Sequence, residues 1–477
     1  MLRSLRRLPA ARFSTAAASA PAAAVSPLHL VCSGCGTEVA ANKKVILKCP
    51  NASAHPDVDH VLEPAQYADL SQSAEDPIST NPFVRYRSLL YSHRVARSRG
   101  MSDTDYVSMA NGLNDSLEAT GGKGFAETPL IYHSPLNCFF KVEVDNVAQS
   151  HKARHLANTM LYLLVLKHTG EVGSTAGRRL AVASCGNAGL AAAEVAAAAE
   201  WPIDVCIPPD ADDAVKARLA ELAPRGVAMI ICDRSGADVH TAKGSIATTT
   251  AADPTFAVMS TLVQDHFSIP FSVQGSECGL AVQGGHTMAW EILTALKRDH
   301  PGVTKLNRMY VQVGGGALGA GLAQGMRRAI HGDATKLAPS LSEEPALHCV
   351  QPIGCQPLDR AWSQVQLDGT TALSAAKTRK RYMRAWDNPK SVAHGILDDE
   401  TYDWVALCDA MERTRGGTLA VDDELIRSAH SYAHSTLSVP TCHTGAAGLA
   451  GLMQHRTAEV RDDGRPPNLV VLSGLER

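Results

Sequence analysis

Apolar strand-like segments alternate with helix-like segments from residue 178 onward, and this alternation restricts the fold more than any other feature. Short apolar runs at 178–184, 203–209 and 227–233 are each followed by a segment with helical character, at 187–201, 210–226 and 236–252. Strands joined in this way pair in parallel, and the helices cover both faces of the sheet. The sequence therefore predicts an α/β fold with open, mostly parallel sheets and helices on both faces.

A second set of such segments follows, and it predicts a second lobe. Helices are expected at 285–300, 317–332 and 444–455, and strands at 308–313, 346–352 and 468–474. A chain of 477 residues is too long for one small core. We expect a two-lobed catalytic core over residues 76–477, with residues 152–265 as approximately the smaller lobe. The more polar stretch 373–404 is expected to be an insertion or the rim of an active site.

The overall charge and composition exclude two classes of partner. The formal net charge is −3 and aromatic residues make up 5% of the chain, so neither a basic patch nor a base-stacking platform for nucleic acid is expected. No segment approaches the roughly twenty consecutive apolar residues that span a bilayer. We therefore predict no nucleic-acid partner and no membrane partner.

The first 25 residues differ from the rest of the chain. They contain four arginines and no acidic residue, and leucines recur every three residues at Leu2, Leu5 and Leu8. A cationic, potentially amphipathic segment of this kind is typical of an organelle transit peptide. We predict a mitochondrial location in preference to a plastid; a disordered tail is the alternative.

A short cysteine-bearing segment and linker are predicted at residues 26–75. Cys32 and Cys35 form a C-x-x-C pair, Cys49 follows, and either His55 or His60 could supply a fourth ligand. Three thiolates and an imidazole suit zinc. The alternative is a degenerate knuckle that keeps the turn and has lost the metal, because a second C-x-x-C pair is missing.

Lys152 stands where a helix is expected to begin. Ala153, Leu156, Ala157 and Met160 recur at helical spacing after it. The helix dipole disfavours a cation at this end. One explanation is that the amine does not remain a free ammonium. Taken alone, the residue is better explained as a solvated helix lysine, and only the loops described next reverse that preference.

Two strand-to-helix loops could bind anions, at residues 183–191 and 313–321. The second contains Gly314, Gly315 and Gly316, and consecutive glycines before a helix let backbone N–H groups approach a phosphate. Close helix–sheet packing is the alternative. In the first loop, Asn187 is expected either to cap its helix or to bind a ligand oxygen.

These three elements together resemble the fold type II enzymes that depend on pyridoxal phosphate (PLP). "SHKARH", "SCGNAG", "GGGALG" and "VVLSGLER" match the family's motifs in the correct order. The resemblance implies that Lys152 carries the cofactor and is the catalytic residue. It implies further cofactor contacts from His151, Asn187, Gly314, Gly315, Gly316, Ala317, Leu318 and Ser473. It implies a site for the substrate carboxylate at Ser184, Gly186, Asn187 and Ala188. His151 could instead be a packed residue.

Within that superfamily the chain most resembles threonine synthases, from Leu28 to the C-terminus. The match includes the cysteine-bearing start, "FVRYRSLL", "AETPL", "GGHTMAWEI" and "GGTLAVDDELIRSAH". The resemblance implies a PLP-dependent lyase of amino-acid metabolism, a small amino-acid substrate such as O-phosphohomoserine, and a homodimer. His286 replaces the lysine of one threonine synthase element, which leaves the phosphorylated substrate open. The alternatives are a serine or threonine dehydratase (ammonia-lyase) and a catalytically silent binding subunit.

Overall fold

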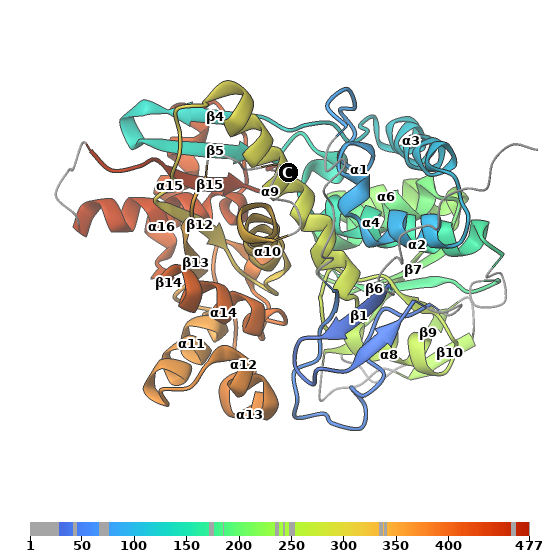
Figure 1. Cartoon of the computed structure of the whole chain (residues 1–477). Coiled ribbons are helices and arrows are strands. Elements are labelled where there is room, and N and C mark those ends of the chain that lie inside the picture. The colour runs from blue at the N-terminus through green and yellow to red at the C-terminus, as the bar shows by residue number, and fades with distance from the viewer. Residues whose placement is uncertain are drawn as a thin grey trace, which may run out of the picture.

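The computed structural model describes residues 28–41, 45–65, 76–170, 176–184, 186–233, 238–241, 244–247, 253–332, 337, 341–458 and 464–476. The predicted transit segment 1–25 lies outside this part of the chain, as do Cys185 and residues 66–75 of the predicted linker. Two lobes are built on separate sheets, with helices α9 and α10 between them (Figure 1). The predicted α/β fold with mostly parallel sheets is confirmed.

The larger sheet has six strands in the order β14-β13-β12-β15-β5-β4. All pairs are parallel except β4 with β5. Alternate residues face opposite sides: Tyr310 and Val470 pack against helices α15 and α16, whereas Val311 and Val471 join the main core with α9, α10 and α14. Both faces of the central strands are therefore buried, whereas the edge strands β4 and β14 are partly exposed. The strands are β4 (Leu130–His133), β5 (Cys138–Val142), β12 (Arg308–Gln312), β13 (Ala346–Pro352), β14 (Gly417–Val421) and β15 (Asn468–Leu472).

The smaller sheet has four strands in the order β11-β6-β7-β8, all parallel. Helix α8 covers one face, where Val258 and Leu262 pack on Ala181 and Cys206, and helices α4 and α6 lie on the other. The elements of this lobe are β6 (Leu180–Ala183), β7 (Ile203–Ile207), β8 (Val227–Ile231), β11 (Ile269–Pro270), α4 (Lys152–His168), α6 (Asn187–Ala198), α7 (Asp213–Glu221) and α8 (Pro254–Gln264).

The cysteine-bearing segment forms a small antiparallel sheet in the order β2-β1-β3. Its strands are β1 (His29–Cys32), β2 (Glu38–Ala40) and β3 (Leu62–Pro64). The other helices are α1 (Pro82–Arg85), α2 (Tyr91–Ser98), α3 (Asp103–Gly121), α9 (Gly279–Asp299), α10 (Ala317–His331), α11 (Pro357–Leu367), α12 (Ala372–Ala375), α13 (Arg379–Tyr382), α14 (Trp404–Thr414), α15 (Asp423–Ser435) and α16 (His443–Ala458). None of the helices formed by the described residues is long and apolar enough to cross a bilayer.

The expected helix at residues 236–252 is wrong. Its described residues form an antiparallel hairpin of β9 (Asp238–Thr241) and β10 (Gly244–Ala247). β-Branched Val239, Thr241 and Ile246 favour strands, and Gly244 has a φ of +124°, which lies outside a right-handed helix. The helix that completes the third strand–helix unit is instead α8, whose N-cap Asp253 accepts a hydrogen bond from the N–H of Thr255.

Helices α9 and α10 cross at glycines, which brings their backbones together between the lobes. A Cβ atom added to Gly321 would lie 3.0 Å from the Cα of Gly285. A Cβ atom added to Gly284 would lie 2.3 Å from the carbonyl oxygen of Arg154, on α4. Helix α9 therefore packs against both neighbours with little room for side chains at these crossings.

A fully buried ion network connects both lobes beside the start of α4. Arg154 Nε lies 2.9 Å from Glu143 Oε2, and its Nη1 lies 2.8 Å from Glu291 Oε1. Lys141 Nζ lies 2.7 Å from Glu291 Oε2. Burial by itself raises the pKa of Glu143 and Glu291, but the charge of Arg154 outweighs it and both pKa values are lowered. The two cations and two carboxylates neutralise one another. Their burial is therefore stable only while all four are present, because the loss of one leaves a buried charge unpaired.

We expect Arg154→Ala to lower the free energy of unfolding by about 3–5 kcal/mol, because it leaves buried carboxylates without their partner. Arg298→Ala is the matched control. Arg298 pairs with Glu127 at 2.8 Å, but its side chain is half exposed, so the expected loss is about 1 kcal/mol or less. Urea unfolding followed by far-UV circular dichroism measures both. Equal losses in the two variants would contradict a structural role for the buried network.

Candidate active site

A cavity of about 650 Å³ lies where the carboxyl ends of strands from both sheets meet. It is lined by Ala183 at the end of β6, by Gln312 at the end of β12 and by Ser473 just after β15. Open parallel sheets bind ligands at this edge. Every residue predicted from the sequence to contact the cofactor or the substrate carboxylate lines this one cavity.

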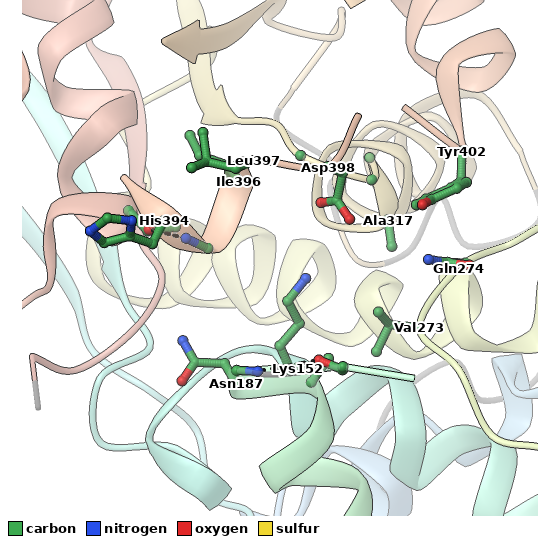
Figure 2. A pocket seen from close by; sticks show the side chains of 18 of the residues that line it. Lys152, Asn187, Val273, Gln274, Ala317, His394, Ile396, Leu397, Asp398 and Tyr402 are labelled. Atoms are coloured by element: carbon green, nitrogen blue, oxygen red, sulfur yellow. Dashed lines mark hydrogen bonds between the residues drawn. The ribbon is translucent and has the colours of Figure 1, made fainter. Parts of the chain in front are cut away.

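Lys152 is the first residue of α4, as predicted, and its side chain projects into the cavity (Figure 2). Its amine points between Asn187 on one side and Ile396 and Leu397 on the other. No hydrogen bond or ion pair with another described residue holds Nζ. Burial lowers the pKa of Lys152, and the carboxyls of Asp398 and Asp403 offset part of that effect. A lowered pKa favours the neutral, nucleophilic amine.

Three helices point their N-termini at the cavity. They are α4 at Lys152, α6 at Asn187 and α10 at Ala317, and all three residues line it. The first N–H groups of each helix have no partner within the helix, and together with the helix dipole they carry partial positive charge. The cavity is therefore suited to a ligand with two anionic ends, such as a phosphate and a carboxylate.

The glycine loop before α10 forms a cradle that a side chain would fill. Gly316 has a φ of +105°, and a Cβ atom added to Gly314 would lie 2.3 Å from Asp398 Oδ2. One added to Gly315 would lie 3.0 Å from the ring of Tyr402. A carboxylate thus already contacts the loop, and a hydrogen bond from the Gly315 backbone stabilises its charge. The loop can accept an anion.

Carboxyl groups line the cavity near this loop. They are Asp253, Asp398, Asp399 and Asp403, whereas Lys152 is the only lysine or arginine among the described lining residues. Burial raises the pKa of Asp398, Asp399 and Asp403; for Asp403 the rise is large. The raised pKa values favour the neutral form of these groups, so the scarcity of cationic side chains, more than carboxylate charge, makes the cavity unfavourable for a further anion.

Asn187 does not cap its helix. The N-cap of α6 is Gly186, without a side-chain cap hydrogen bond, and Asn187 is the first helical residue. Its Oδ1 is buried and has no partner among the described residues. Its Nδ2 lies against Gly474, where an added Cβ atom would be 3.1 Å away. The capping alternative is therefore excluded, and the amide is available to a ligand.

Ser473 is oriented by Gln312, a residue that the sequence did not single out. Gln312 Nε2 donates a hydrogen bond to Ser473 Oγ, so the hydroxyl hydrogen remains free to donate elsewhere. The other amide atom, Gln312 Oε1, is buried without a described partner. A glutamine inside a buried strand resembles any other polar core residue in sequence, and only the strand order places it beside Ser473.

His151 precedes Lys152 and is hydrogen-bonded to the backbone of Ser473. Its Nδ1 is 3.2 Å from the carbonyl oxygen of Ser473, which can only accept, so Nδ1 carries the hydrogen. Burial, with Lys152 nearby, lowers the pKa of His151 well below its usual value, so the ring is neutral and Nε2 is an acceptor. A direct hydrogen bond to a phosphate would need a second proton on Nε2. The geometry favours a packed, orienting histidine.

The polar stretch expected as an insertion or rim forms one wall of the cavity. Trp386, Asn388, His394 and Tyr402 belong to it, together with Ile396 to Asp399. Figure 2 shows Ile396, Leu397 and Asp398 across from Lys152. No motif in the sequence marked these individual residues, because irregular segments carry no periodic pattern.

The residues present fit the cofactor implied by the resemblance. The glycine cradle would take the phosphate, Lys152 would form the covalent link, and Ser473 would face the pyridine nitrogen. Three buried polar atoms on lining residues have no described partner: His151 Nε2, Asn187 Oδ1 and Gln312 Oε1. Orphaned buried polar groups are costly, and a polar ligand in the cavity would supply partners for these three.

Comparison with known proteins agrees with this fit. A family model described as "Pyridoxal-phosphate dependent enzyme" matches residues 123–474. No curated protein matches the sequence of this chain. Solved structures share the fold. The threonine deaminase of T.th. has a TM-score of 0.53 and 20% identity, over 77% of this chain and 98% of that chain.

Two further solved structures are similar to the same degree. Maize serine racemase has a TM-score of 0.52 and 17% identity, over 76% of this chain and 92% of that chain. An L-serine ammonia-lyase of the fungus Rhizomucor miehei has a TM-score of 0.52 and 15% identity, over 74% of this chain and 94% of that chain. At these identities the likeness concerns the fold alone.

The carboxyls beside the glycine cradle predict how cofactor binding depends on pH. Asp398 must be neutral to accept a phosphate next to it, and its pKa is already raised. Ionisation at higher pH would place two anions side by side, so the affinity should weaken as pH rises through that pKa. Asp398→Asn removes this charge. We expect log Kd to increase less steeply with pH in the variant than in the wild type. The two slopes should differ by up to about one log unit of Kd per pH unit.

Absorbance titration of the cofactor-free protein with pyridoxal phosphate measures Kd without any assay of activity. Asp145→Asn is the control, because Asp145 is exposed and lies outside the cavity. Indistinguishable pH slopes in wild type and Asp398→Asn would show that the phosphate does not bind beside Asp398.

Proposed function

This chain belongs to the family of pyridoxal-phosphate-dependent enzymes, and we propose that it is a lyase that eliminates a side-chain substituent from a small amino acid, as an ammonia-lyase does. The observation that carries the proposal is the position of Lys152. Its amine lies free in a cavity between a glycine cradle and the N-terminus of α6. A silent binding subunit would have no need for a lysine held in this way.

Lys152 has two proposed roles. It would hold the cofactor through Nζ, and after a substrate amine replaces it, the freed amine would remove the proton from the substrate Cα. Its lowered pKa suits a general base near neutral pH. Bound pyridoxal phosphate supplies the electron sink for the resulting carbanion.

The N-terminus of α6 is proposed to hold the substrate carboxylate. The backbone N–H groups at Asn187 and Ala188 have no partner within the helix, and Ser184 and Gly186 line the same side of the cavity. A carboxylate bound there would place the substrate Cα within reach of Lys152. The Asn187 amide would orient either the carboxylate or the cofactor.

Ser473 is proposed to steer the reaction toward elimination. A neutral hydroxyl that already accepts a hydrogen bond from Gln312 can donate its own hydrogen to an unprotonated pyridine nitrogen. Unlike a carboxylate, it would not hold that nitrogen protonated, which limits charge delocalisation into the ring. Elimination and replacement are then favoured over transamination.

The charge of the cavity favours an ammonia-lyase over a threonine synthase acting on O-phosphohomoserine. A substrate phosphate would need cationic partners, but Lys152 is the only lysine or arginine among the described lining residues and four aspartates accompany it. His286, which replaces a lysine of the threonine synthase pattern, bonds Gln324 on α10 and does not line the cavity.

An absorbance scan combined with product assays tests the proposal. Wild-type protein should show a cofactor band near the visible edge that Lys152→Ala lacks, because the covalent link is lost. The variant's rate should fall by roughly 10²–10⁴-fold or more, since the general base is removed as well. Lys123→Ala is the control, because Lys123 is exposed and outside the cavity.

The substrate panel should contain serine, threonine, 2,3-diaminopropionate and O-phosphohomoserine. We expect ammonia and a 2-keto acid from one or more of the three unphosphorylated amino acids, and no phosphate release from O-phosphohomoserine. Phosphate release with threonine formation would instead establish the threonine synthase reaction. A wild-type protein without the absorbance band would refute the role of Lys152.

A further inference from the structure

Four side chains of the types that can bind a metal lie close together at the N-terminal sheet, away from the cavity. Cys32 ends β1, Cys35 lies in the turn to β2, and Cys49 and His60 come from the segment that leads into β3. One ligand atom from each lies within 4.8 Å of all the others. Sequence left the fourth ligand open between two histidines, and the structure brings His60 into the cluster.

Two distances within this cluster match those around a tetrahedral metal ion, and the other ligand pairs lie within 4.8 Å. Cys35 Sγ lies 3.7 Å from Cys49 Sγ, and Cys32 Sγ lies 3.4 Å from His60 Nδ1. Four ligands placed tetrahedrally at zinc–sulfur and zinc–nitrogen bond lengths are about 3.3–3.8 Å apart. A disulfide would need a much shorter sulfur–sulfur distance of about 2 Å. The cluster is already close to the geometry of a bound ion.

The ring of His60 is oriented as a metal ligand. Its Nε2 lies 3.2 Å from the carbonyl oxygen of His55, which can only accept a hydrogen bond. Nε2 therefore carries the hydrogen, and the lone pair of Nδ1 faces Cys32. Metal-binding histidines usually donate their second N–H to a carbonyl or carboxylate in this way, which fixes the tautomer.

The turn that presents Cys35 depends on two glycines. Gly36 has a φ of +72°, and a Cβ atom added to Gly34 would lie 1.6 Å from the carbonyl oxygen of Asp59. The N–H of Gly36 donates to the carbonyl of Cys32 at 2.9 Å, which closes the turn. This tight turn holds the C-x-x-C pair over the residues that precede β3.

We propose that Cys32, Cys35, Cys49 and His60 bind one zinc ion in a closed, structural site. Three thiolates and one imidazole are soft to borderline donors that favour zinc over magnesium or calcium. Four protein ligands complete a tetrahedron and leave no position for a substrate. Cys32, Cys49 and His60 are buried, so the ion is shielded from solvent.

The site supports a wall of the active-site cavity. Asp59, next to His60, accepts a hydrogen bond from Trp404 Nε1 at 3.3 Å and pairs with Arg379 at 3.4 Å. Its N–H donates to the carbonyl of Ala376 at 2.8 Å. Arg379 and Trp404 flank the stretch that contains Trp386 to Asp403. Zinc would thus anchor that wall to the N-terminal sheet β2-β1-β3, whichever reaction the cavity catalyses.

Elemental analysis of the full chain, purified under reducing conditions from zinc-supplemented medium, tests the site. We expect one zinc per chain in the wild type and loss of the ion in Cys35→Ser and in His60→Ala. His55→Ala should retain it, because only the His55 backbone carbonyl takes part. Zinc that is retained equally in all variants would be adventitious and would overturn the proposal, as would reduced wild-type protein without zinc.

A second measurement applies if a variant fails to fold. Titration of the folded wild type with a thiol-modifying reagent, in the presence of a chromophoric zinc chelator, should release one zinc as the cluster thiols react. Replacement by cobalt should give the intense sulfur-to-cobalt absorption of thiolate coordination. A Cys35–Cys49 disulfide found in peptides of the purified protein, or cobalt without thiolate bands, would refute the zinc site.

Discussion

The structure depends on the buried ion network around Arg154. This one side chain connects Glu143, which follows β5, to Glu291 on α9, and it lies two residues after Lys152 on α4. A guanidinium with carboxylates on both sides cannot shift without leaving a charge unpaired in the interior. The first turn of α4 is therefore held at a defined position relative to both sheets, and the reactive amine is positioned with it.

Charge balance also governs the cavity itself. Three helix N-termini supply partial positive charge, and four aspartates are among the described residues that line the cavity. Burial raises the pKa of three of them, which weakens their opposition to that charge. The arrangement offers two places for an anion, the glycine cradle and the start of α6, while the remaining wall carries carboxyl groups but no lysine or arginine among its described residues. A small zwitterionic substrate suits such a field better than one that carries a second phosphate.

Those features of the site that require a particular residue at a particular turn could be predicted from the sequence. Lys152 at a helix start, Asn187 in its loop and the three glycines before Ala317 all line the cavity as expected. The polar stretch 373–404 was expected as an insertion or rim, but Gln312 and the individual residues of the wall from Trp386 to Asp403 could not be predicted, since only the packing of distant segments places them there. The sequence predicted a helix where strands 238–241 and 244–247 pair, because no regular polar–apolar alternation marks these short strands.

The glycine crossing between α9 and α10 limits how this chain can diverge. Even a methyl group on Gly321 would contact the backbone at Gly285. Substitution of either glycine at this crossing would therefore require the two helices to move apart. Helix α9 also abuts the backbone of Arg154. New substrate specificities would therefore arise by substitution in the irregular wall opposite Lys152, where side chains border the cavity. The glycine crossing between α9 and α10 would remain unchanged.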